Sequence, residues 1–304
     1  MKLMCQRPHD RRHMARLFSL LALLLTAACG AAVSTPRQAE EAARPASPIL
    51  QPPAAAPLTP GPGSSSFTGP ESRAAAGPCR AVSFEASDYT VCELDLRRYR
   101  VGLFWQDRDG RPYGSLYAFK RAMAAAGDPP VVSMNAGMYH EDLSPVGLFV
   151  SGGRQLNPAN EGDGDGNFFM KPNGVFYVDG ESAGILETGA YLRRAPAAGI
   201  ATQSGPMLVI DGALHPLFSD DGASRKIRNG VGVRDDHTVV FAISSDRVSF
   251  GSFARLFRDG LGCRNALYLD GSISALSAPD GLSVGWGIRV GPILAAFDRA
   301  APVS

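Results

Sequence analysis

Residues 230–244 read GVGVRDDHTVVFAIS, and this stretch decides the class of fold. Valine alternates with glycine at its start, and an almost wholly apolar run, residues 239–244, forms its end. The four polar residues at 234–237 separate the two runs, as a tight connection between strands does. Short apolar runs divided by glycine and polar turns predict a fold rich in short β-strands.

Similar punctuated runs recur from Val82 to Phe297. The clearest are residues 131–135, 146–151, 174–178, 207–210, 266–269 and 289–295. Two segments have helical spacing instead: residues 115–126, with a glycine and two prolines soon after, and residues 252–258. Strands outnumber helices without regular alternation. We therefore predict one α+β domain with a mixed β-sheet of short strands and two or more helices.

The chain of 304 residues divides by composition. Residues 30–78 hold 10 of the 23 prolines, 12 alanines, six charged residues and one aromatic residue. Such a segment buries too little apolar surface to offset the entropy lost on ordering. We predict a disordered Pro/Ala-rich tether over residues 29–78. Residues 79–304 keep 29 of the 34 glycines and form the predicted working domain.

The net charge of +1 divides along the same boundaries. Residues 1–28 carry four more positive than negative charges, whereas residues 79–304 carry 22 basic and 25 acidic side chains, a net charge of −3. A mildly acidic domain lacks the positive surface that binds nucleic acid. We therefore expect no nucleic acid among its partners.

The N-terminal sequence predicts export. Residues 17–28, LFSLLALLLTAA, form an apolar run behind a basic stretch, too short for a membrane span and typical of a signal peptide. The following LLTAACG is similar to a bacterial lipoprotein processing site. We predict a lipoprotein signal peptide over residues 1–28, lipidation of Cys29 and a membrane anchor. The alternative is an ordinary signal peptide cut near Ala28. Translation starts at either Met1 or Met14.

These features predict a location on the periplasmic side of the bacterial cell envelope, at the outer membrane if the cell is Gram-negative. Export permits disulfides. Cys79 and Cys92 flank an alternating apolar segment with a turn-like stretch at 85–88, which predicts a hairpin that places them opposite each other. We predict a Cys79–Cys92 disulfide and a buried thiol at Cys263.

Several common catalytic motifs are absent from the sequence, including G-x-S-x-G, H-E-x-x-H, C-x-x-C and the P-loop. Residues 163–167, DGDGN, are similar to the first half of a calcium loop. However, Phe168 and Gly174 stand where that loop needs glycine and glutamate. We interpret the stretch as a surface loop and expect no metal and no cofactor.

Polar residues and glycines gather at the ends of predicted strands, where rigid scaffolds often carry chemistry. They do so in residues 131–150, 202–212, 224–233 and 267–274. Taken singly, each motif has a simpler interpretation, because an Asp-Gly pair usually forms a turn and a lone arginine usually lies at the surface.

Together, the segments resemble the phosphodiester glycosidase family over about residues 89–296. The motifs are NAGMYH (135–140), PVGLFV (145–150), GNFFMKPNGVF (166–176), ATQSGPMLV (201–209), RNGVGV (228–233) and LGCRNALYLDGSIS (261–274). The order matches the bacterial branch of the family. Ile273 departs from the better studied branch, which has glycine there. The resemblance implies hydrolysis of the bond between a sugar's anomeric carbon and a phosphodiester oxygen.

That chemistry needs positive charge at the phosphate and a carboxylate at the sugar. The matched motifs make Asp270 the candidate catalytic carboxylate, with a turn-stabilising role as the alternative. Glu141 is the candidate partner carboxylate and His140 a candidate proton shuttle. Arg228 is the candidate phosphate ligand, because a guanidinium can bind two phosphate oxygens. Arg225 is a second candidate, with a surface role as its alternative.

Further polar groups of the motifs are candidate hydrogen-bond partners of sugar or phosphate. They are Asn135, Gly137, Asn167, Gln203, Ser204, Asn229, Gly271 and Ser272. We therefore predict an exported hydrolase that cleaves a sugar-1-phosphodiester in a cell-envelope or exopolysaccharide substrate. The alternative is a non-catalytic envelope lipoprotein that binds glycan.

Overall fold

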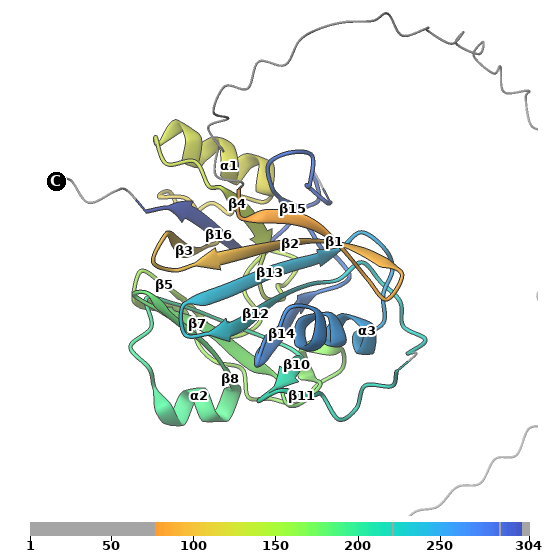
Figure 1. The fold of residues 1–304 in the computed structure, drawn as a ribbon. Coiled ribbons are helices and arrows are strands. Elements are labelled where there is room, and N and C mark those ends of the chain that lie inside the picture. Colours follow the sequence, from red (N-terminus) through yellow and green to blue (C-terminus); the bar gives the residue numbers. More distant parts are fainter. Residues whose placement is uncertain (1–76, 221, 286, 300–304) are drawn as a thin grey trace, which may run out of the picture. The chain divides into compact units, whose positions relative to one another are not determined.

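The two apolar runs of residues 230–244 form neighbouring antiparallel strands, β12 (Asn229–Asp235) and β13 (Thr238–Ser244), with Gly230 opposite Ala242. The structure is a computed structural model that describes residues 77–220, 222–285 and 287–299 (Figure 1). The predicted signal peptide, Cys29 and nearly all of the predicted tether lie outside the described residues.

Strands β12 and β13 lie at the centre of a seven-stranded antiparallel sheet with the order β1-β2-β13-β12-β14-β10-β11. Strand β14 continues the central hairpin on one side and ends at the candidate carboxylate Asp270. The remaining bounds are β1 (Cys79–Phe84), β2 (Ser87–Asp95), β14 (Asn265–Asp270), β10 (Met207–Ile210) and β11 (Ala213–Leu214).

Two smaller antiparallel sheets complete the β-structure. The four-stranded sheet has the order β15 (Leu276–Ser277), β4 (Val132–Asn135), β16 (Ile293–Asp298) and β3 (Tyr99–Phe104). The five-stranded sheet has the order β6 (Arg154–Asn157), β5 (Phe149–Ser151), β9 (Ile200–Ser204), β7 (Gly174–Asp179) and β8 (Ser182–Glu187).

Both predicted helices are present. Helix α1 (Leu116–Ala125) begins after Ser115, whose side chain accepts a hydrogen bond from the N–H of Ala118. Helix α3 (Phe250–Arg255) continues into a π-helical turn, η2 (Leu256–Gly260). A short helix not predicted from the sequence, α2 (Thr188–Arg194), and a 3₁₀ turn, η1 (Asn167–Phe169), complete the described helices. The prediction of a single α+β domain is confirmed. The expected mixed β-sheet is wrong, because the strands instead pair antiparallel in three sheets, through contacts between distant segments.

Side chains along each strand of the seven-stranded sheet alternate between its two faces. Apolar side chains lie on both faces. In β14, Leu267 and Leu269 join a core cluster that includes residues of all three sheets, whereas Ala266 and Tyr268 join a second cluster with α3. Helix α3 accordingly covers the outer face of this sheet (Figure 1). Helices α1 and α2 pack in separate apolar clusters with the smaller sheets.

The three cysteines of the domain lie in strand β1, strand β2 and the loop before β14. Cys79 and Cys92 are paired in register, and the structure joins them in a disulfide. Burial raises the pKa of the Cys263 thiol to about 12, so this buried group is a poor nucleophile.

Across the described residues, no helix combines the length and apolar character needed to cross a membrane.

Candidate active site

The turn that follows β14, residues 270–274, is built around the carboxylate of Asp270, a residue only 8% exposed. Its Oδ1 accepts hydrogen bonds from the N–H groups of Gly271, Ser272 and Ile273, at 2.6, 2.9 and 3.4 Å. Its Oδ2 accepts none within the described residues and is not sealed from solvent. One oxygen therefore shapes the turn, and the other makes no hydrogen bond to the described residues.

Two fully buried asparagines fix this turn to the strands. Asn229 Oδ1 accepts a hydrogen bond from the N–H of Asp270 at 3.0 Å, and Asn229 Nδ2 donates to the carbonyl of Asn135 at 2.8 Å. Asn135 Nδ2 donates to the carbonyl of Ile273 at 2.8 Å, and its Oδ1 accepts from the N–H of Ala275 at 2.8 Å. Both side chains therefore position the turn and do not face a pocket.

Arg228 is fully buried on the α3 side of the sheet. Its Nε donates to the carbonyl of Val248 at 2.9 Å, Nη1 to the hydroxyl of Tyr268 at 3.1 Å, and Nη2 to the carbonyl of Ser224 at 2.8 Å. The guanidinium carbon lies 3.7 Å from the ring centre of Phe250. The planar fork is thus occupied by protein groups and is not open to a phosphate in this structure.

The charge of Arg228 has no carboxylate partner among the described residues. Burial lowers its pKa, and the neighbouring Tyr268 opposes that shift. Gly271 lies close to this charge: a Cβ there would clash with the Tyr268 hydroxyl and lie 3.3 Å from Arg228 Nη1. Glycine at 271 therefore lets the turn pass directly over a buried positive charge.

Burial raises the pKa of the Asp270 carboxyl. The hydrogen bonds from the N–H groups of Ser272, Gly271 and Ile273 and the charge of Lys226 act in the opposite direction, with smaller effects. The ionised carboxylate is therefore a stronger base than an exposed aspartate.

A pocket of about 460 Å³, here called the cationic pocket, opens beside the turn. Two positively charged side chains, Lys226 and Arg247, line it, and Lys226 Nζ donates to the hydroxyl of Ser272 at 3.5 Å. The other lining residues are Ile227, Gly271, Ser272, Ser274, Val284, Gly285 and Ile288. The pocket therefore offers two cations and the residues of the turn to a negatively charged ligand.

A second pocket of about 380 Å³, here called the Glu141 pocket, also borders the turn, through Ile273. His140 and Glu141 line it and are exposed. Tyr139 lines it too and donates its hydroxyl to the carbonyl of Arg289 at 2.9 Å. Burial, with a smaller effect of the Asp270 charge, raises the pKa of Tyr139 to about 12, so this hydroxyl stays neutral.

Gln203 and Ser204, at the end of β9, line neither pocket and serve packing instead. Gln203 Oε1 accepts hydrogen bonds from the N–H groups of Leu148 and Asn160, at 3.0 and 2.9 Å. Ser204 Oγ donates to the carbonyl of Leu269 at 3.0 Å, one residue before Asp270. These buried side chains tie the five-stranded sheet to neighbouring loops and to β14.

Three other candidates also lie outside the two pockets. Gly137 packs against β9, since a Cβ there would lie 2.5 Å from the carbonyl oxygen of Gln203. Asn167 lies near the Tyr268 hydroxyl, since its side chain acts to lower the pKa of that group. Arg225 is exposed. The structure therefore brings Gly271 and Ser272 to the cationic pocket and His140 and Glu141 to the Glu141 pocket. Asp270 begins the turn that borders both pockets but lines neither of them.

Lys226 and Arg247 were not among the candidates from the sequence. Lys226 stands inside the motif segment at 224–233, two residues before Arg228, and in an extended chain these two side chains are spaced to lie on the same side. Arg247 follows β13 with no local motif. Among the described residues, no three His, Cys, Asp or Glu side chains lie close enough together to hold a metal ion.

Comparison with known proteins supports the resemblance. A family model described as phosphodiester glycosidase matches residues 128–281, half of the chain. The uncharacterized protein YigE of Escherichia coli K12 is 38% identical over 175 residues, which cover 58% of this chain and 68% of that protein.

A solved structure shares the fold. The catalytic domain of zebrafish N-acetylglucosamine-1-phosphodiester alpha-N-acetylglucosaminidase, auto-inhibited by its pro-peptide, has a TM-score of 0.52 and 12% identity and covers 73% of this chain and 82% of that one. A hypothetical protein from Synechocystis has a TM-score of 0.49 and 15% identity, covering 73% and 61%. At these identities the likeness concerns the fold alone. The family model and the bacterial relative show that this chain belongs to the phosphodiester glycosidase family, hydrolases of phosphodiester-linked sugars.

Proposed function

We propose that the protein is an exported hydrolase that cleaves the anomeric bond of a sugar-1-phosphodiester in a cell-envelope or exopolysaccharide substrate. The observation that carries this proposal is the partly free carboxylate of Asp270, held on a turn between the cationic pocket and the Glu141 pocket. The family defines the chemistry, and the turn supplies a base next to an anion-binding surface.

In the proposed reaction the phosphodiester lies in the cationic pocket. Lys226 and Arg247 neutralise its charge, and the Ser272 hydroxyl offers a hydrogen bond. As water attacks the anomeric carbon, the bond to the phosphodiester oxygen breaks and its electron pair leaves with the phosphate. The departing group is a phosphate monoester, a stable anion, so its departure requires little help from a general acid.

Asp270 Oδ2 takes the proton of the attacking water. Its raised pKa supports this role, because a stronger base abstracts the proton more readily. Exposed His140 and Glu141 in the neighbouring pocket then carry the proton to solvent. Arg228 acts from behind the turn, as a fixed positive charge and as a support for Tyr268.

The decisive experiment is turnover of a panel of sugar-1-phosphodiesters by the purified full chain, compared with Asp270→Asn. We expect Asp270→Asn to lower kcat by at least about 100-fold, in the range that general-base catalysis contributes. Asp236→Asn, in the exposed turn between β12 and β13, is the matched control and retains activity. Near-normal turnover by Asp270→Asn would exclude Asp270 as the base. Binding without turnover by the wild type would instead favour a glycan-binding lipoprotein.

The proposed location rests on residues 1–28 and Cys29. We propose that Cys29 is lipidated and anchors the protein on the periplasmic side of a bacterial envelope membrane. Labelling of cells with radioactive palmitate is expected to mark the wild type and not Cys29→Ser. Equal labelling of both proteins would rule out lipidation at Cys29.

A further inference from the structure

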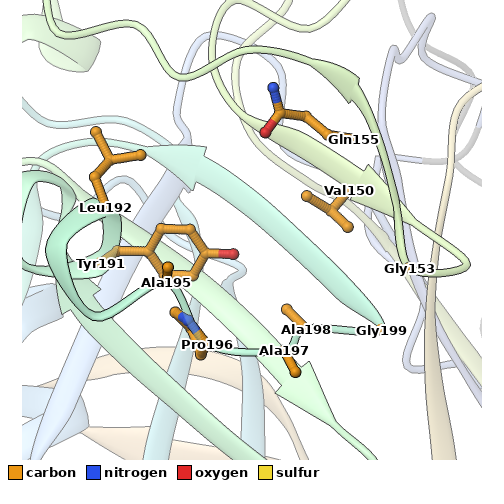
Figure 2. A pocket seen from close by; sticks show the side chains of 10 residues that line it. All are labelled: Val150, Gly153, Gln155, Tyr191, Leu192, Ala195, Pro196, Ala197, Ala198 and Gly199. Atoms are coloured by element: carbon orange, nitrogen blue, oxygen red, sulfur yellow. The ribbon is translucent and has the colours of Figure 1, made fainter.

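A third pocket lies on the five-stranded sheet and shares no residue with the two pockets at the Asp270 turn. Its volume is about 580 Å³. One wall is formed by α2 and the chain that follows it, and the opposite wall by β5, β6 and the turn between them (Figure 2). The lining residues are Val150, Gly153, Gln155, Tyr191, Leu192 and residues 195–199. We call it the Tyr191 pocket.

The Tyr191 pocket contains the hydroxyl of a largely buried tyrosine. Tyr191 is 7% exposed, and its hydroxyl makes no hydrogen bond within the described residues. Figure 2 shows this hydroxyl directed into the space between the two walls. Burial raises the pKa of Tyr191, so the group stays a neutral donor and acceptor. A ligand that met this hydroxyl would satisfy a polar atom that the protein leaves unpaired.

The lining of the pocket restricts the class of ligand. Lysine, arginine, aspartate and glutamate are all absent from the lining, so a charged ligand would enter without a counter-charge. A purely apolar ligand would cover the Tyr191 hydroxyl without offering it a hydrogen bond, whereas exposed Gln155 can donate or accept one at the rim. Val150, Leu192 and Pro196 meanwhile present apolar surface. The combination fits an uncharged molecule with apolar C–H faces and several hydroxyls.

A neutral sugar unit has these properties. We infer that the Tyr191 pocket binds a neutral sugar residue of the substrate polymer, away from the bond that is cleaved. This inference rests on the proposed function, because a polymeric substrate would extend beyond the Asp270 turn. Strand β6 links the two regions: Gln155 borders the Tyr191 pocket, and Asn157 borders a further pocket that contains His140.

The test is titration of the full chain with neutral oligosaccharides, using cellotriose, maltotriose and chitotriose as probes in saturation-transfer NMR. We expect saturable binding of at least one probe and about three- to tenfold weaker binding by Tyr191→Phe, the loss of one hydrogen bond. Ala197→Trp, which fills the pocket from an exposed position, is expected to abolish binding. Tyr177→Phe is the matched control, because its ring lies 5.6 Å from that of Tyr191 but outside the lining.

Hydrolysis of a small sugar-1-phosphodiester separates this inference from the proposed function. Tyr191→Phe and Ala197→Trp are expected to leave that reaction unchanged, since the small substrate does not reach the Tyr191 pocket. Failure of the proposed function would remove hydrolysis in the wild type while sugar binding persisted. The inference is overturned if no probe binds the wild type, or if Tyr177→Phe weakens binding as much as Tyr191→Phe does.

Discussion

Replacing Arg228 by lysine distinguishes two roles for this residue: support of the turn and direct binding of the phosphate. The sequence suggested direct phosphate binding, whereas the structure buries the guanidinium and directs its three nitrogens to Val248, Tyr268 and Ser224. A lysine keeps the charge but can replace only part of this planar fork. The support role therefore predicts a loss of stability, whereas the phosphate-ligand role predicts a loss of substrate affinity.

The magnitude follows from the hydrogen bonds. Bonds to charged groups contribute about 1.5 to 3 kcal/mol each, and a lysine ammonium that keeps one of the three loses two. We expect Arg228→Lys to lower the free energy of unfolding by about 3 to 6 kcal/mol. For a domain of this size, that corresponds to a fall in Tm of roughly 6 to 24 °C. Activity falls as well, because the turn loses its support.

Urea denaturation and steady-state kinetics on the same samples test this reasoning. Arg154→Lys, at an exposed position in β6, is the control and is expected to change stability by less than about 0.5 kcal/mol. A variant Arg228→Lys with wild-type stability and a KM raised tenfold would refute the structural role. That result would instead support direct binding of the phosphate by Arg228.

Three further predictions concern the turn and the disulfide. Burial raises the pKa of Asp270, so the acid limb of the kcat/KM pH profile should lie above the pH range of an ordinary aspartate. Lys226→Met should move this acid limb to higher pH, because the lysine charge lowers the pKa of Asp270. A limb unmoved in Lys226→Met would show that the two groups are not coupled. Asn229→Ala should lower the free energy of unfolding, measured by urea denaturation, by about 2 to 4 kcal/mol. The substitution removes the hydrogen-bond partner of the buried N–H of Asp270 and that of the buried carbonyl of Asn135. Cys79→Ser with Cys92→Ser should lower stability by about 3 kcal/mol, given a separation of 13 residues, and reduction of the wild type should have the same effect.

Local patterns predicted the elements of the fold but not their assembly. The strands at 207–210 and 239–244 and the helix at 115–126 have strong periodicity and clear end signals, and all three are present. Helix α2 was missed because its cap is a glutamate at 187 and its seven residues give too few turns for a periodic signal. The division into three sheets depends on pairings between distant segments, such as β2 with β13, which no local pattern encodes.

The candidate site shows the same limit. Asp270 was a candidate because it ends an apolar strand in a motif that resembles the family, since an Asp-Gly pair alone usually forms a turn. In the structure it begins the turn whose residues border both pockets, but it lines neither pocket itself. The burial of Arg228 depends on which face of β12 is covered. In RNGVGV, Arg228 shares a face with Gly230 and Gly232, and both glycines lie against phenylalanines of the α3–η2 segment. Glycines on alternate positions make room for a covering helix, so they were the available sign that Arg228 is buried.

The distribution of charge explains how a mildly acidic domain can hold an anionic substrate. Residues 79–304 carry a net charge of −3, so long-range attraction of a phosphodiester is not expected, and salt screens what exposed charges remain. Around the turn the balance is reversed: Lys226 and Arg247 line the pocket, and Arg228 lies behind Gly271 without a carboxylate partner in the described part of the chain. A buried charge is screened less than an exposed one. The positive potential at the turn is therefore local and short-ranged, which favours capture of a phosphate already in contact with the surface.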